Sequence, residues 1–135
     1  MSGDPEVPDP LRPGLSARLP ATVTDADTAT AFGSGDVPVL ATPRLLAWLE
    51  AATVAAVVDQ LPAGATTVGA QVRLTHSAAS PVGARLEVSA RLTAVQGRRL
   101  AFAAEARDAA GEVVGSAEIE RVLVDRERFV QRVSG

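Results

Sequence analysis

The spacing of apolar residues changes twice along the chain. From residue 15 to about residue 30, apolar and polar residues alternate, which predicts a first β-strand, and Pro20 favours an edge position for it. From Pro43 to about Gln60 nearly every residue is apolar, which predicts a helix that is buried on most sides. Beyond it the period returns to two and predicts four further strands, at 68–76, 84–94, 100–106 and 113–124.

Turn and cap residues separate these elements. Thr42 followed by Pro43 predicts a helix start with Thr42 as the N-cap residue, and Leu61-Pro62-Ala63-Gly64 ends the helix. Gln96-Gly97 predicts a tight hairpin, and residues 108–111 predict a second turn. The last four strands are therefore expected to form a meander.

The helix is too apolar for one face of a sheet to cover. This favours an α+β hotdog fold, in which an antiparallel sheet wraps around one long central helix, and a homodimer, with a higher oligomer left open. Another α+β sandwich is the alternative. Residues 1–14, with four of the nine prolines, predict a flexible arm; 15–130 form the domain and 131–135 a C-terminal tail.

Composition narrows the possible chemistry. The chain has no cysteine, no tyrosine and no lysine, so it excludes thiolate nucleophiles, phenolic acids and lysine Schiff bases. A single histidine cannot build the usual zinc site, and we expect no structural metal and no cofactor. A net charge of -3 argues against nucleic acid as a partner.

The sequence also argues against a membrane location. Its longest apolar stretch, residues 51–58, is far shorter than the roughly 20 residues that a membrane span needs. The first residues are acidic and rich in proline, unlike a secretory signal. We therefore expect a cytoplasmic protein.

Three residues can carry chemistry. Glu50 has mostly apolar helical neighbours, so burial would raise its pKa by up to about 3–5 units, toward the range of a general base; a solvated helix glutamate is the alternative. Thr42 lies eight residues earlier on roughly the same side of the helix, as an N-cap or as a donor to an oxyanion. His76, the only imidazole, ends a strand as a proton carrier or as a hydrogen-bonded structural residue.

Three segments, residues 39–50, 68–83 and 95–100, carry a resemblance to a known family. The Thr-x7-Glu pattern and the Thr-His-x-Ala-Ala-x-Pro-x-Gly pattern resemble the fluoroacetyl-CoA thioesterase family of hotdog proteins over roughly residues 15–130. The resemblance implies a catalytic set of Thr42, Glu50 and His76, and a substrate-binding backbone at Gly69. It implies hydrolysis of an acyl-CoA thioester within a homodimer.

One loop departs from that family. The fluoroacetate-specific enzyme has aromatic lid residues before the helix, where this chain has Gly33-Ser34-Gly35-Asp36. A small or unidentified acyl-CoA is therefore the expected substrate. The fold also permits two rivals, an enoyl-CoA hydratase or dehydratase and a non-catalytic acyl-CoA binding module.

Overall fold

One long helix and one antiparallel sheet make up most of the chain. A computed structural model describes residues 6–8 and 10–135. The strands are β1 (Ser16–Thr22), β2 (Ala65–His76), β3 (Arg85–Gln96), β4 (Arg99–Arg107) and β5 (Val113–Asp125). The helices are α1 (Ala29–Phe32), α2 (Thr42–Val57) and α3 (Arg126–Ser134), with 3-10 turns at Asp25–Asp27 and Val58–Gln60.

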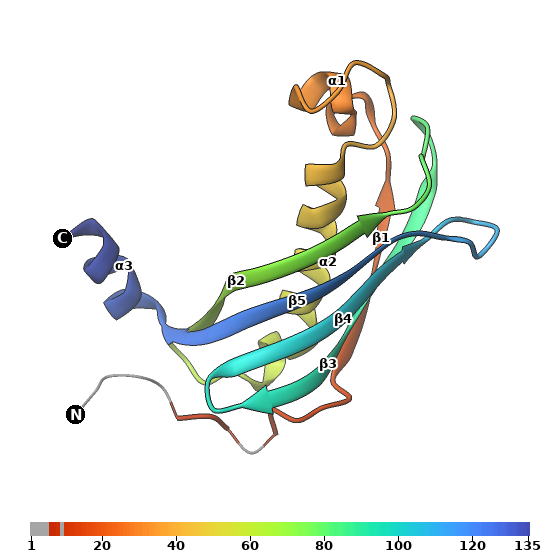
Figure 1. The fold of residues 1–135 in the computed structure, drawn as a ribbon. Helices are drawn as coiled ribbons and strands as arrows, with labels where there is room; N and C mark the ends of the chain where they lie inside the picture. Colours follow the sequence, from red (N-terminus) through yellow and green to blue (C-terminus); the bar gives the residue numbers. More distant parts are fainter. Residues whose placement is uncertain (1–5, 9) are drawn as a thin grey trace.

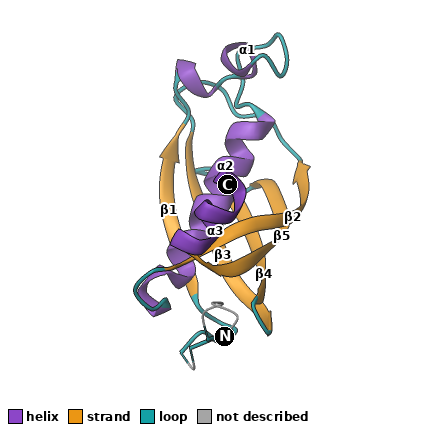
Figure 2. Cartoon of the chain, turned by 90° about the vertical axis from the view of Figure 1, so that its left-hand side faces the viewer, coloured by secondary structure: helices purple, strands orange, loops and turns teal. Residues whose placement is uncertain are grey.

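The sheet curves around α2. Its strand order is β1-β3-β4-β5-β2, and every neighbouring pair is antiparallel. Figure 1 shows α2 lying across one face of the sheet, and Figure 2 shows the strands curving around it. The hotdog arrangement expected from the sequence is therefore confirmed.

The expected meander of the last four strands is wrong in one connection. Only β3, β4 and β5 follow one another in the sheet, because β2 pairs with β5 and β1 pairs with β3. Helix α2 lies between β1 and β2 in the chain, and these two strands form opposite edges of the sheet. Strand β2 therefore lies beside β5 and not beside β3. The edge position expected for the strand that contains Pro20 is confirmed.

The first strand is shorter than expected, because polar side chains take over beyond Thr22. Asp27 accepts hydrogen bonds of 2.8 Å from both the backbone N–H and the hydroxyl of Thr24, and Thr28 caps the short helix α1. Such local side-chain bonds compete with strand pairing. Alternation alone therefore misassigned residues 23–30.

Strand β2 contains a bulge that the sequence pattern hid. Gly69 lies opposite Arg121 and Gln71 lies opposite Glu120, so Ala70 is the extra residue. Residues directly opposite each other share a face of the sheet, which places Val68 with Val122 on the outer face and Val72 with Ile119 on the inner face. The period of two that predicts the strand at 68–76 would place Val68, Ala70, Val72 and Leu74 on one face, and this expectation is wrong.

The core lies between α2 and the inner face of the sheet. Its largest fully buried side chains are Leu40, Leu45, Leu49, Leu92, Leu100, Phe102, Ile119 and Leu123. Leu11 is also buried, and the Gly14 N–H donates to the Leu92 carbonyl, while residues 1–5 and 9 of the expected arm lie outside the described residues. The expected tail forms the end of α3. No helix in the described ranges is long and apolar enough to cross a membrane.

Candidate active site

The end of β2 meets the start of α2 through one hydrogen bond. The Thr42 Oγ1 atom lies 2.8 Å from His76 Nδ1, although the two residues are 34 positions apart in the chain. The N-cap position falls on Ala41, and no side chain caps this helix. The expected N-cap role of Thr42 is therefore wrong, because its hydroxyl is directed to the imidazole.

His76 is held in an environment that favours the neutral ring. Burial lowers the pKa of His76 below its ordinary value of 6.5, and the backbone of Ala78 offsets part of this effect by favouring the protonated form. The Nε2 atom is shielded from solvent and has no hydrogen-bond partner among the described residues. A neutral imidazole whose Nδ1 is engaged leaves Nε2 as the atom that can exchange a proton.

Glu50 faces a different part of the sheet. Its Oε2 atom lies 3.4 Å from a terminal guanidinium nitrogen of Arg121, and its side chain is about one third exposed. A Cβ atom at Gly69 would lie 2.9 Å from the same oxygen. The missing side chain of Gly69 therefore makes room for the carboxylate against β2.

Arg121 is the site residue that the sequence reasoning missed. It is buried on the inner face of β5, and Thr67 receives two of its hydrogen bonds: Nε donates to the hydroxyl and a terminal nitrogen to the carbonyl. Burial lowers the pKa of Arg121, while the charge of Glu50 raises it. A signal was present, since Arg121 interrupts the inward-facing run of Ala117, Ile119 and Leu123.

The bulge in β2 allows Gly69 and His76 to share a face. The two residues are seven positions apart, and in a regular strand an odd separation places side chains on opposite faces. Gly69 lies opposite Arg121, and His76 lies opposite Gly115, all on the inner face beneath α2. The extra residue, Ala70, therefore brings both positions to the helix.

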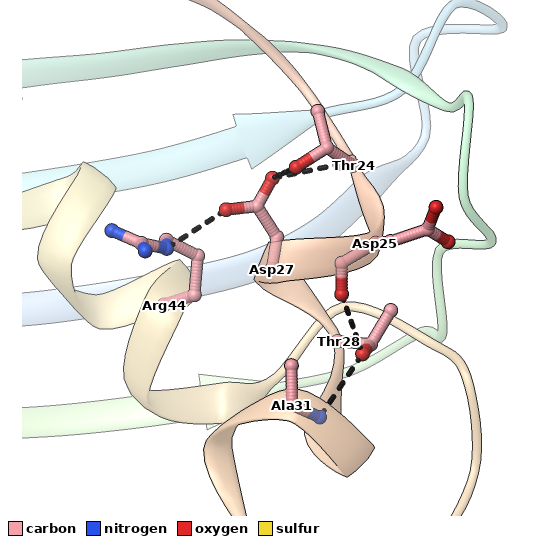
Figure 3. Close-up of polar contacts among 6 residues, drawn as sticks. All are labelled: Thr24, Asp25, Asp27, Thr28, Ala31 and Arg44. Carbon is pink, nitrogen blue, oxygen red and sulfur yellow. Dashed lines mark hydrogen bonds and ion pairs between the residues drawn. The ribbon is translucent and has the colours of Figure 1, made fainter.

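An ion pair ties the preceding loop to the first turn of α2. An oxygen of Asp27 lies 2.9 Å from Arg44 Nε (Figure 3). The Ala41 N–H donates to the Asp27 carbonyl. The Arg44 guanidinium also lies 4.9 Å from the centre of the Phe32 ring, within the range of a cation–π contact. Ala41 and Arg44, on either side of Thr42, are thus both bonded to Asp27.

The expected site residues fall into two neighbouring pairs. Thr42 and His76 form one pair. Glu50 and Gly69 form the other, and there Arg121 forms an ion pair with Glu50. The first pair offers a hydroxyl and an imidazole, and the second offers a carboxylate beside a buried cation. Such groups can stabilise an oxyanion, move a proton and attack or hydrate a carbonyl carbon.

Solved structures share this fold over nearly their whole length. The fluoroacetyl-CoA thioesterase FlK has a TM-score of 0.84 and 29% identity, covering 92% of this chain and 96% of FlK. A Thermus thermophilus hypothetical protein of the thioesterase superfamily has a TM-score of 0.84 and 27% identity, covering 93% and 95%. A hot-dog-like protein from Thermanaerovibrio acidaminovorans, at 24% identity and TM-score 0.81 over 90% and 89%, shares the fold. Fold and relatives together define an acyl-CoA thioesterase of the hotdog class.

The family follows from the sequence profile. The family described as fluoroacetyl-CoA-specific thioesterase, FlK, matches residues 23–127. The chain belongs to this family. No curated protein sequence matches the chain significantly.

The ion pair beside Thr42 is expected to contribute to stability. Asp27→Ala removes the partner of Arg44 and the acceptor of both Thr24 bonds, and should lower the free energy of unfolding by about 1–2 kcal/mol. Urea unfolding followed by Trp48 fluorescence measures the change. The matched control is Asp25→Ala in the same turn, whose exposed side chain should matter by less than about 0.5 kcal/mol. Equal effects of the two substitutions would contradict this account.

Proposed function

We propose that Thr42, Glu50 and His76 form the catalytic site of a thioesterase that hydrolyses a small acyl-CoA to the free acid and coenzyme A. The observation that carries the proposal is the 2.8 Å contact between Thr42 Oγ1 and His76 Nδ1. It joins two groups suited to acyl transfer on elements that the fold brings together. Glu50 lies two helical turns from Thr42 on the same helix and supplies the carboxylate.

The tautomer of His76 assigns the roles of the first pair. If Nδ1 carries the ring proton and donates it to Thr42 Oγ1, the Thr42 hydroxyl keeps its own proton for the oxyanion of the tetrahedral intermediate. The partnerless Nε2 then holds the free lone pair and accepts the proton that the reaction releases. One hydrogen bond thus orients both groups.

Glu50 acts on the thioester carbonyl by one of two routes. The carboxylate attacks the carbon, expels the coenzyme A thiolate and leaves an acyl anhydride that water then opens, or it removes a proton from water, which attacks directly. Arg121 forms an ion pair of 3.4 Å with the Glu50 carboxylate that both routes use. Gly69 leaves space for this carboxylate beside β2 and would bind the substrate through its backbone.

Solved relatives support a short acyl chain. FlK variants have been solved with acetyl-CoA and with fluoroacetate and CoA. The loop that precedes α2 has only small or polar residues at 33–36, and the nearby Phe32 is partly exposed beneath Arg44. This composition favours a small acyl group without selection for fluorine.

We also propose a homodimer. Ala47, Ala51 and Val54 of α2, with Val58 in the 3-10 turn that follows, form an exposed apolar stripe. Strand β2 is an open edge strand with Val72 exposed on its inner face. A second copy would cover the stripe and pair with the edge, which removes apolar surface from water. We further propose that the dimer acts on its acyl-CoA substrate in the cytoplasm, as the sequence predicts.

A direct assay tests the site. Purified protein is expected to release free thiol from acetyl-CoA, propionyl-CoA or fluoroacetyl-CoA, and Glu50→Gln, His76→Ala and Thr42→Ala should each lower kcat by about 100-fold or more. Glu118→Gln, on the exposed outer face of β5, and Thr75→Ala, exposed beside His76, serve as matched controls with wild-type rates.

The same assay separates the rival functions. Loss of enoyl absorbance from a crotonyl-CoA probe without thiol release would assign a hydratase. Tight binding of acyl-CoA with no turnover would assign a binding module. Thiol release that both Glu50→Gln and His76→Ala leave intact would refute the proposed site.

The pH dependence should report His76. Because burial lowers the pKa of His76 below its ordinary value of 6.5, the decline of kcat/KM that accompanies protonation of Nε2 should be centred below pH 6.5. A pH–rate profile, compared with an NMR titration of the only imidazole in the chain, measures this. A decline centred above 6.5, or one that His76→Ala retains in its residual rate, would argue against a base role.

The dimer can be tested at its apolar stripe. Val54→Asp places a charge where the second copy would remove water, and should weaken association by about 100-fold. Sedimentation equilibrium should find a wild-type dimer and a folded monomeric variant. Val82→Asp changes an exposed valine outside the stripe and should remain dimeric. A monomeric wild-type protein would overturn this part of the proposal.

A further inference from the structure

The Leu45 side chain of α2 packs directly against Gly115 of β5. Gly115 lies on the inner face of β5, directly opposite His76 in the pairing with β2. A Cβ atom at this position would lie 2.5 Å from Leu45 Cδ2, 3.2 Å from Cδ1 and 3.3 Å from Cγ. Carbon atoms that are not bonded prefer separations of about 3.5–4.0 Å, so alanine requires Leu45 to move.

The side chain of Leu45 has little room to move. It is completely buried, and protein interiors are close-packed. Leu45 belongs to the first turn of α2, where its N–H donates to the Ala41 carbonyl, and it lies three residues after Thr42. A displacement of Leu45 is therefore expected to displace the first turn of α2, which contains Thr42.

The other glycine beneath α2 differs in the neighbour that it admits. A Cβ atom at Gly69 would meet the end of the Glu50 side chain, which is partly exposed and can swing away. At Gly115 the neighbour is the branched end of a buried leucine. The backbone of Gly115 has no positive φ, so conformation alone does not demand glycine there. Glycine is needed there because the Leu45 side chain packs directly against it.

We propose that Gly115 is a positioning residue: by admitting Leu45 against β5, it sets the spacing between α2 and β2 at which Thr42 meets His76. Its effect on catalysis rests on the proposed thioesterase function. Its effect on the hydrogen bond does not. Displacement of reacting groups by about 1 Å can cost about 100-fold in rate, so a small shift of the first turn of α2 would be felt.

The lone histidine provides a direct readout of this spacing. In protein labelled with 15N-histidine, the Nδ1 signal of His76 reports the bond to Thr42 without ambiguity, because the chain has no other imidazole. Thr42→Val supplies the reference spectrum for a broken bond. Gly115→Ala is expected to move the Nδ1 shift toward that reference. Gly115→Ala combined with Leu45→Val, which removes the two Cδ atoms that would lie closest to the new Cβ, should restore it.

Kinetics provide the second readout. Gly115→Ala should lower kcat by about 10- to 100-fold with little change in KM, and the double variant should recover the kcat of Leu45→Val alone. Ala117→Gly serves as the matched control, since it changes the next inward position of β5 but adds no atom against Leu45. It should leave both kcat and the Nδ1 shift at their wild-type values.

The outcomes separate this proposal from the proposed function. An unchanged Nδ1 shift in folded Gly115→Ala overturns the positioning role, whatever the activity. If Gly115→Ala does not fold, the double variant decides, and a double variant with the Thr42→Val spectrum also overturns it. Absence of any thiol release by wild-type protein would refute the thioesterase site alone, because the spectra would still decide the role of Gly115.

Discussion

The approach of α2 to the inner face of the sheet is the constraint on which the rest of the structure depends. Thr42 and Glu50 belong to the helix, whereas His76, Gly69 and Arg121 belong to strands, so no chain connection fixes their distances. Packing fixes them instead. Gly115 leaves space for Leu45 at one end of the contact, and Gly69 leaves space for the Glu50 carboxylate further along. A side chain at either position would collide with a residue of the helix.

The electrostatics of the site follow from the same packing. A core built from small aliphatic side chains brings Arg121 and His76 close to apolar surroundings, which lower the pKa of each group. Arg121 is compensated by Glu50 and by Thr67, so its charge survives burial. For His76, burial is the largest effect on the pKa, and it favours the neutral ring. The site therefore presents a neutral imidazole at one end and a paired carboxylate at the other.

Periodicity predicted the main elements because each has one apolar face or is apolar throughout. The long helix, the hairpin at Gly97 and the final strand all followed from local pattern. Local pattern failed where a contact distant in sequence competes with it. Thr42 satisfied the rule for an N-cap, yet its hydroxyl is bonded to a residue 34 positions away. Ala70 continued an apparent alternation, but it is the extra residue of a bulge. The interruption of the inward-facing run of β5 by Arg121 becomes informative only once the structure shows which face of the strand is inward.

By itself, the sequence determined which groups were available: one imidazole, one glutamate within an apolar helix and a threonine at its start, with no thiol, phenol or amine to replace them. It also determined the sheet and helix that would carry them, since periodicity is a local property of the chain. Only the tertiary structure decided which groups meet. Contacts such as Thr42 with His76 and Glu50 with Arg121 depend on strand order, on one bulge and on the depth at which a leucine packs over a glycine. These are set by the competition of all buried side chains for the same space, which no single stretch of sequence contains.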